Sequence, residues 1–292
     1  MELRALEHFV AVVDEGGFTR AAERLLVAQP GVSAQIRNLE RELGQALFVR
    51  HARGATLTAA GQAALPHARA ALAAAAAVAD GVAELAGLLR GTLRVGMLSS
   101  SNGMDMPELL SEFRRRAPHV EVSVTEDDAA TLLAAVRAGT LDVAWTATAD
   151  APVADLACHT VATEPLSALV APGHRWARRR TVALADLCSE PLLAVPRGGG
   201  MRTVLDEACA AHGLRPRIDL EANSPVLLAA LARQRLGVAV VPASYAPLAE
   251  GLRALRIVRP GLVGRVQVVW RREFPSPATR AFTALVRAGT PG

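Results

Sequence analysis

Hydrogen-bonding side chains gather in the first turns of a predicted helix over residues 29–43. Gln29, Ser33 and Arg37 lie on the face opposite an apolar stripe, and Gln35 lies at the side of that face. A Gln amide can pair with the exposed edge of adenine, while a Ser hydroxyl or a helix N-terminus can hold a phosphate. These residue types at this spacing could therefore contact a nucleic-acid duplex.

Three short helices are predicted to position those side chains. Residues 2–14 carry apolar side chains at helical spacing, and the glycine pair that follows ends this helix. Thr19 is predicted to cap a second helix over residues 20–26. Pro30 suits the start of the third helix, because its missing N–H would have no partner there. The pattern is that of a helix-turn-helix, in which the start of the last helix meets the base edges.

A short hairpin with a basic tip is predicted after these helices. Residues 47–50 and 55–58 are expected to form two strands around Arg53, whose side chain could reach the DNA backbone or the narrow minor groove. Residues 1–58 hold seven Arg and seven acidic residues, so the placement of these side chains, and not net charge, indicates DNA binding. The alternative is a plain three-helix packing module. The hairpin and the polar helix start favour DNA binding.

The stretch FTRAAERLLVAQPGVSAQIRNLERELGQALFVRHARGATLTAAG, residues 18–61, resembles the winged helix-turn-helix of the LysR-type transcriptional regulators. It carries the family's F-T-x-A-A-x-x-L, Q-P-x-V-S-x-Q-I-x-x-L-E-x-x-L-G, L-F-x-R and L-T-x-A-G motifs. The resemblance implies a recognition helix and a wing that grips the flanking groove. Ala34 stands where the family often has Arg, which removes one phosphate or base contact. The predicted DNA-binding residues are Thr19, Arg20, Gln29, Pro30, Ser33, Gln35, Arg37, Arg50 and Arg53.

A long Ala-rich helix is predicted over residues 59–90. The helix carries an apolar seam that it cannot bury alone, formed by Leu65, Leu72, Val78, Val82 and either Leu85 or Leu89. The seam could pack against its own chain or against a second copy. The family resemblance implies a dimerisation helix, and a two-fold dimer would match a pair of palindromic half-sites.

Strands alternate with helices from residue 91 onwards, which indicates an α/β fold with mostly parallel sheets. The resemblance implies an effector domain of periplasmic-binding-protein type over residues 91–292. One subdomain is expected at 91–162 with 266–292, and the other at 163–265. The crossovers are placed near 160–164 and 264–268. The expected fold is therefore α/β with an N-terminal all-α winged helix-turn-helix, a linker helix and two α/β subdomains.

Polar side chains follow the predicted strands or open the predicted helices of this domain. Ligands of open α/β sheets bind beyond the carboxyl ends of strands, where helix N-termini favour anions. Ordinary turn and capping chemistry is the alternative for each residue taken singly. Arg197 or Arg202 beside a helix start indicates a small carboxylate or other anion. The predicted effector-binding residues are Ser99, Ser100, Thr125, Thr146, Arg202 and Asn223.

Composition and motifs argue against several other classes. The sequence has no G-x-S-x-G nucleophile elbow, no metal-ligand spacing of His and no cofactor fingerprint, so we expect neither catalysis nor a bound cofactor or metal. Cys188 and Cys209 are expected to be buried, inert thiols. No long apolar run and no signal-peptide pattern occurs, so a cytoplasmic protein is expected.

The sequence thus predicts a transcriptional regulator that binds promoter DNA under the control of a small-molecule effector. Self-association as a dimer or tetramer and contact with RNA polymerase are the further expected partnerships. The rivals are a winged helix fused to a catalytic α/β domain, and a solute-binding protein with a helical extension. The first would need a nucleophile, metal cluster or cofactor motif. The second would leave the polar face of residues 29–38 unexplained.

Overall fold

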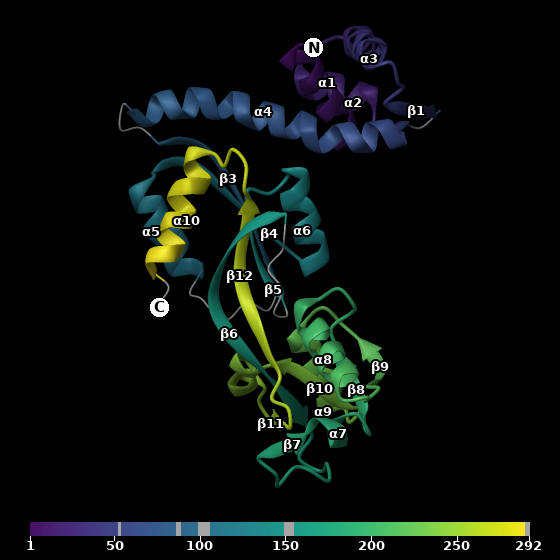
Figure 1. The fold of residues 1–292 in the computed structure, drawn as a ribbon, viewed down its shortest axis with the longest axis vertical. Coiled ribbons are helices and arrows are strands. Elements are labelled where there is room, and N and C mark those ends of the chain that lie inside the picture. The colour runs from purple at the N-terminus through teal and green to yellow at the C-terminus, as the bar shows by residue number, and fades with distance from the viewer. Residues whose placement is uncertain (52–53, 86–88, 99–105, 149–154, 290–292) are drawn as a thin grey trace. The chain divides into compact units, whose positions relative to one another are not determined.

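A computed structural model of the chain describes residues 1–51, 54–85, 89–98, 106–148 and 155–289. The chain divides into two compact units (Figure 1). The first comprises Met1–Leu89 with two short segments, Arg137–Thr140 and Glu273–Pro277. The second comprises Arg90–Val136, Leu141–Arg272 and Ala278–Gly292.

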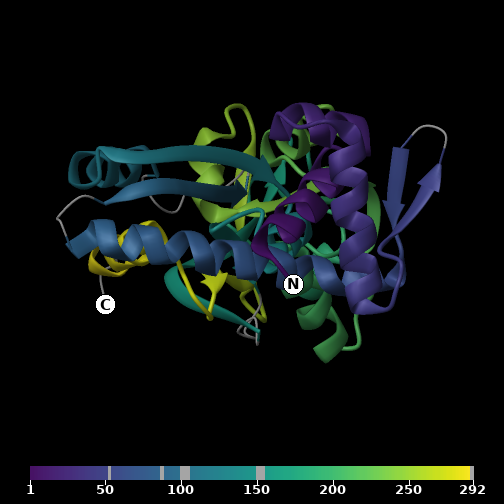
Figure 2. The same cartoon turned by 90° about the horizontal axis from the view of Figure 1, so that it is seen from above.

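The first unit contains the predicted three helices, hairpin and long helix. Its elements are α1 (Leu3–Asp14), α2 (Phe18–Leu25), α3 (Gln29–Leu43), β1 (Phe48–His51), β2 (Gly54–Leu57) and α4 (Ala59–Leu85). Phe9, Val12 and Ile36 are fully buried where the apolar faces of α1 and α3 meet. Gly44 ends α3 with a φ of +70°, as the sequence predicts. Figure 2 shows β1 and β2 as a hairpin that projects from the helices of this unit.

The predicted cap of α2 is wrong. The helix begins at Phe18, and Gly17 is the residue at the N-cap, so Thr19 lies inside the first turn. The ring of Phe18 packs edge-on against Phe48, with their centroids 5.6 Å apart. Phe18 therefore packs inward at the first position of the helix, and Thr19 is exposed.

The first half of the second unit is a mostly parallel sheet covered by helices. Its elements are β3 (Arg90–Leu98), α5 (Met106–Arg116), β4 (His119–Asp127), α6 (Ala129–Ala138), β5 (Val143–Thr148) and the returning α10 (Pro277–Gly289). β3 pairs in parallel with β4 and β5. On one face Trp145 and Phe113 meet Phe282 of α10. Ala144 joins a separate cluster with Leu132 of α6. α5 and α10 therefore share one face, and α6 covers the other (Figure 1).

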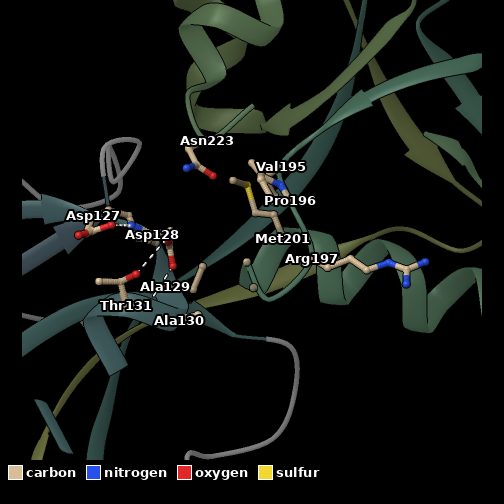
Figure 3. Close-up of a pocket in the computed structure, with 14 residues that line it drawn as sticks. Asp127, Asp128, Ala129, Ala130, Thr131, Val195, Pro196, Arg197, Met201 and Asn223 are labelled. Carbon is tan, nitrogen blue, oxygen red and sulfur yellow. Dashed lines mark hydrogen bonds between the residues drawn. The ribbon is translucent and has the colours of Figure 1, made fainter. Parts of the chain in front are cut away.

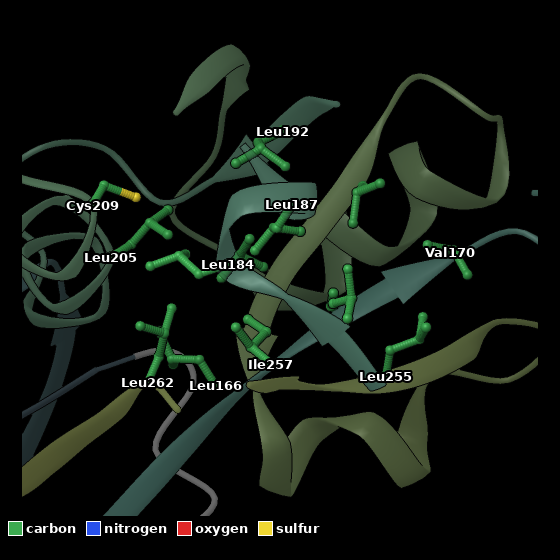
Figure 4. Close-up of a cluster of buried hydrophobic side chains, with 14 of the residues drawn as sticks. Leu166, Val170, Leu184, Leu187, Leu192, Leu205, Cys209, Leu255, Ile257 and Leu262 are labelled. Atoms are coloured by element: carbon green, nitrogen blue, oxygen red, sulfur yellow. The ribbon is translucent and has the colours of Figure 1, made fainter. Parts of the chain in front are cut away.

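The second half of this unit has its own apolar core (Figure 4). Its elements are β7 (Thr181–Ala183), α7 (Leu184–Leu187), β8 (Pro191–Ala194), α8 (Gly200–Ala211), β9 (Arg217–Glu221), α9 (Pro225–Arg233), β10 (Val238–Pro242), the 3-10 helix η1 (Ala243–Leu248) and β11 (Arg253–Val258). β8 pairs in parallel with β9 and β10. The sequence predicts most of these elements but misses β7, α7, η1 and β11, which are short or have strongly mixed polarity.

Two long strands join the halves of this unit. β6 (Leu156–Val170) pairs with β12 (Val263–Arg271) at its start and with β10 and β11 at its end. The predicted crossovers at 160–164 and 264–268 fall within these two strands. Pro165, which directly follows the crossover predicted at 160–164, lies inside β6 opposite Val263.

Candidate DNA-binding surface and effector pocket

The start of α3 is open to solvent. Gln29 and Pro30 are exposed in its first turn, and Gln35 is half-buried. Ala28 stands at the N-cap and supplies no side-chain hydrogen bond. Pro30 has no N–H and the Gly31 N–H donates to the Ala28 carbonyl at 2.9 Å, so this end offers the Gln29 backbone N–H together with the Gln29 amide. A phosphate or a base edge could be contacted there.

Ser33 has a role that its residue type did not predict. The side chain is only 5% exposed. Its hydroxyl oxygen accepts hydrogen bonds from Nη1 of Arg37 at 3.0 Å and from Nη1 of Arg50 at 2.9 Å. The Arg50 guanidinium also lies 4.4 Å from the centroid of the Phe18 ring. Ser33 thus fixes two cations, one on α3 and one on β1, while its own side chain is buried.

The wing and the start of α2 border a shared groove of about 500 Å³. Thr19 and Arg20 of α2 line it from one side, and His51 and Gly54 of the hairpin from the other. Gly54 has a φ of +151°, and a Cβ there would lie 2.6 Å from the backbone oxygen of Gly16. The hairpin can approach the helices this closely only with glycine at that position. Arg53, the predicted tip contact, lies outside the described residues.

Ion pairs attach the long helix to the helix-turn-helix. Asp14 of α1 accepts from Arg24 of α2 at 3.3 Å and also pairs with Arg69 of α4. Arg69 is nearly buried, and Ala68 of the same helix belongs to the core of this unit. The first turns of α4 are therefore part of the helix-turn-helix body.

The predicted effector residues that the structure describes lie in different surroundings. Thr125 is exposed on β4. Thr146 on β5 is completely buried, and its hydroxyl has no hydrogen-bond partner among the described residues. Asn223 lines a pocket of this unit, described below. Ser99 and Ser100 lie outside the described residues.

Arg202, predicted to bind the effector, lies in a buried ion-pair network. It is 4% exposed, and its Nε donates to Asp206 at 2.9 Å while Nη1 donates to Glu221 at 2.6 Å. Burial acts to lower the pKa of Arg202, but the hydrogen bonds to Glu221 and Asp206 raise that pKa overall. The guanidinium therefore stays charged, and two carboxylates already neutralise it.

A pocket of about 300 Å³ does lie in the second unit. Most of its walls come from the starts of α6 and α8 (Figure 3). A Cβ on Gly198 would lie 3.7 Å from the Cβ of Ala130, so the loop before α8 lies against the start of α6. The lining residues are Leu98, Asp127, Asp128, Ala129, Ala130, Thr131, Ala147, Val195, Pro196, Arg197, Gly199, Gly200, Met201 and Asn223.

The two helix starts differ in how they are capped. The Asp128 carboxylate accepts the backbone N–H of Thr131 at 2.9 Å and its hydroxyl at 3.1 Å. These bonds hold the pKa of Asp128 below its ordinary value, and the bond from the backbone N–H of Thr131 contributes most. Gly199 at the N-cap of α8 has no side chain with which to cap that helix. The α6 start is therefore capped by its own carboxylate, and the α8 start has no side-chain cap among the described residues.

Sequence reasoning missed the Asp127–Asp128 pair. These carboxylates stand directly after a predicted strand and before a predicted helix, which is the same position that singled out Thr125 and Asn223. The signal was present, but hydroxyl and amide side chains were favoured over carboxylates. Arg197 lines the pocket, and its side chain points away from the other labelled residues (Figure 3).

The thiols of Cys188 and Cys209 lie together in the core of the second half, with their Sγ atoms 3.4 Å apart. Cys209 is buried and Cys188 is half-buried. Burial raises the pKa of both thiols, that of Cys209 to about 12. Such thiols carry little thiolate at neutral pH and are poor nucleophiles.

The described residues lack two other kinds of feature. No group of three or more His, Cys, Asp or Glu side chains among them could hold a metal ion. No described helix is both long and apolar enough to cross a membrane.

Two family models match the chain. Residues 3–62 match the bacterial regulatory helix-turn-helix protein of the lysR family, and residues 86–291 match the LysR substrate binding domain. The HTH-type transcriptional regulator ShiR of Corynebacterium glutamicum is 36% identical over 248 residues, 82% of each chain. The HTH-type transcriptional regulator IlvR of Caulobacter vibrioides is 32% identical, over 98% of this chain and 97% of its own.

Solved structures give the same assignment. A full-length OxyR variant from Pseudomonas aeruginosa aligns with a TM-score of 0.77 at 27% identity, covering 99% of this chain and 97% of that one. Full-length CbnR in complex with its target DNA aligns with a TM-score of 0.65 at 29% identity, covering 99% of each chain. The chain belongs to the LysR family of transcriptional regulators, with a DNA-binding helix-turn-helix in its first unit and an effector-binding domain in its second.

Proposed function

We propose that α3 enters the major groove of promoter DNA and that Arg37 and Arg50 contact the duplex beside it. The observation that carries this proposal is the pair of hydrogen bonds from both guanidinium groups to Ser33. A hydroxyl and an aromatic ring hold the two cations without neutralising them, so their charge remains available for phosphates. Gln29 and Gln35 supply the base-edge contacts, and Thr19, Arg20 and Arg53 extend the contact surface.

Regulation in this proposal acts through the pocket between the starts of α6 and α8. The pocket lies in the domain that the family uses for effectors, and Asn223 is the predicted residue that lines it. A bound effector would favour one orientation of the two halves of the second unit, which β6 and β12 join.

Self-association is proposed through the later turns of α4. Leu65 and Leu72 of the predicted seam pack against the core of their own unit. Val78 and Val82 are 70% and 66% exposed on the same helix. A second copy of α4 would cover these side chains and place two recognition helices on a two-fold axis. The chain would act as a dimer or tetramer in the cytoplasm, where the DNA lies, with RNA polymerase as a further partner.

The test is fluorescence anisotropy of the full chain on duplex DNA from upstream of its own gene, with scrambled duplex beside it. We expect a specific complex that is tighter than the scrambled one by about a thousandfold. Arg217→Ala is the control, because Arg217 is an exposed arginine of the second unit that pairs with Asp219. Equal binding of both duplexes, persisting across genomic fragments and candidate ligands, would contradict the proposal.

A further inference from the structure

The effector pocket has two poles of opposite chemistry. At the start of α8, the backbone N–H groups of Gly200 and Met201 have no hydrogen-bond partner among the described residues, and Gly200 is buried. Buried N–H groups at a helix start require a partner from a side chain, water or ligand. Gly198 and Gly199 place no side chain there, so a ligand can approach this backbone closely. This pole accepts a negatively charged or carbonyl oxygen.

The opposite pole is acidic. Asp127 and Asp128 line the pocket at the start of α6. Oδ1 of Asp127 accepts the N–H of Asp128 at 2.9 Å, and its second oxygen has no partner among the described residues. Asp128 caps α6 and adds a second negative charge. A ligand group at this pole must donate hydrogen bonds, and a cation fits best.

Among the described residues, neither nearby arginine neutralises the acidic pole of the pocket. Arg197 is directed away from the labelled pocket residues (Figure 3). Arg202 is neutralised by Asp206 and Glu221. A ligand carrying only a carboxylate would therefore meet two carboxylates without a compensating guanidinium, which costs affinity.

The walls between the poles are mainly apolar. They consist of Leu98, Ala129, Ala130, Ala147, Val195, Pro196 and Met201. A volume of about 300 Å³ suits a small ligand with a short hydrocarbon body.

We propose that this pocket binds a small zwitterion of the amino-acid type with an apolar side chain. Its carboxylate would accept from the N–H groups of Gly200 and Met201, and its ammonium group would donate to Asp127. Its side chain would lie against Val195 and Met201. This inference rests on the proposed function of the domain, and it replaces the small anion that the sequence predicted.

The experiment is isothermal titration calorimetry of the full chain with matched probes. The zwitterions are L-leucine and L-phenylalanine. For each, one analogue lacks the ammonium group (4-methylpentanoate or 3-phenylpropanoate) and one lacks the carboxylate (3-methylbutylamine or 2-phenylethylamine). We expect at least one zwitterion to bind, and both of its analogues to bind at least about tenfold more weakly, because each loses a charge-assisted contact.

A variant pair locates the ammonium group. Asp127→Asn should weaken the zwitterion by roughly ten- to hundredfold and leave the weak binding of its acid analogue unchanged or improved. Glu126→Gln is the matched control: it removes the same charge one residue earlier on β4, outside the pocket lining, and should leave the affinity unchanged. Thermal unfolding of both variants checks that the domain is intact.

Three results would overturn the inference: neither zwitterion binds, an acid analogue binds as tightly as its zwitterion, or Asp127→Asn and Glu126→Gln behave alike. Specific DNA binding measured without any probe separates this failure from that of the proposed function. A chain that binds its promoter but no zwitterion contradicts only the ligand class. A chain that binds no DNA specifically contradicts the regulator proposal whatever the calorimetry shows.

Discussion

Arg50 in the first unit and Arg202 in the second are both fixed by hydrogen bonds, but their partners differ in charge. Arg50 is held by the Ser33 hydroxyl and the Phe18 ring. Arg202 is held by the carboxylates of Asp206 and Glu221. A neutral partner orients a guanidinium and leaves its charge available to another molecule, whereas two carboxylates neutralise that charge within the fold. An arginine is therefore a good candidate to bind an anion only when the side chains that hold it are neutral.

The largest expected effect is a loss of stability on substituting Arg202, which substitution of Arg50 should not cause. Arg202→Ala should lower the free energy of unfolding by about 2–3 kcal/mol, because it leaves Asp206 and Glu221 without their cation. The expected cost is below that of a fully buried pair, since both carboxylates are partly exposed. Urea unfolding followed by circular dichroism measures it. An unchanged unfolding midpoint would show that Arg202 is not a structural charge.

Arg50→Ala should act on DNA binding instead. We expect affinity for the specific duplex to fall roughly ten- to hundredfold, because a charge-assisted contact is lost. The slope of log affinity against log salt should become shallower by about 0.9 if that contact is a phosphate. Anisotropy across a salt series gives both quantities. A drop in stability as large as that of Arg202→Ala, with DNA affinity retained, would reverse the comparison.

Ser33→Ala tests the neutral partner. The variant retains both guanidinium groups but releases them from their common acceptor, so DNA affinity should fall by about fivefold. The salt slope should stay close to that of the unaltered chain, because no phosphate-binding charge is removed. The same anisotropy series measures it. A slope reduced as much as in Arg50→Ala would indicate that Ser33 itself contacts a phosphate.

The smallest expected effect concerns a carboxylate that caps its own helix. Asp128→Ala should cost about 1 kcal/mol of stability, because Thr131 loses its cap. The pKa of Asp128 lies below its ordinary 3.8 in the folded chain, so its contribution is present above that pH and is lost as pH falls through the folded pKa. Unfolding measured from pH 7 to pH 3 should show the difference between the two chains shrinking at the acid end. A difference that grows towards acid would contradict the assignment.

Sequence patterns predicted the first unit well because its chemistry is local. Gln29, Ser33 and Arg37 lie within nine residues on one helix, so helical spacing alone places them on a common face. The contact between Ser33 and Arg50 was not predictable in this way, because it joins two elements whose packing depends on Phe18 and Phe48.

The pocket was less predictable because its residues come from separate strands and helices. The strand-end rule located Asn223 and the loop that opens α8, and it passed over Asp127 and Asp128. It also favoured Arg202, because residue type shows the charge of a side chain but not the tertiary partners that neutralise it. Asp206 lies one helical turn away and was visible in the sequence, whereas Glu221 reaches Arg202 only through the pairing of β8 with β9.

The most direct test of the account compares the salt dependence of promoter binding by the unaltered chain, Arg50→Ala and Arg202→Ala, each at a temperature where all three are folded. We expect a shallower slope and weaker binding for Arg50→Ala, and an unchanged slope for Arg202→Ala. A slope that is the same for Arg50→Ala as for the unaltered chain, with undiminished affinity, would contradict the claim that this guanidinium is held in place for DNA.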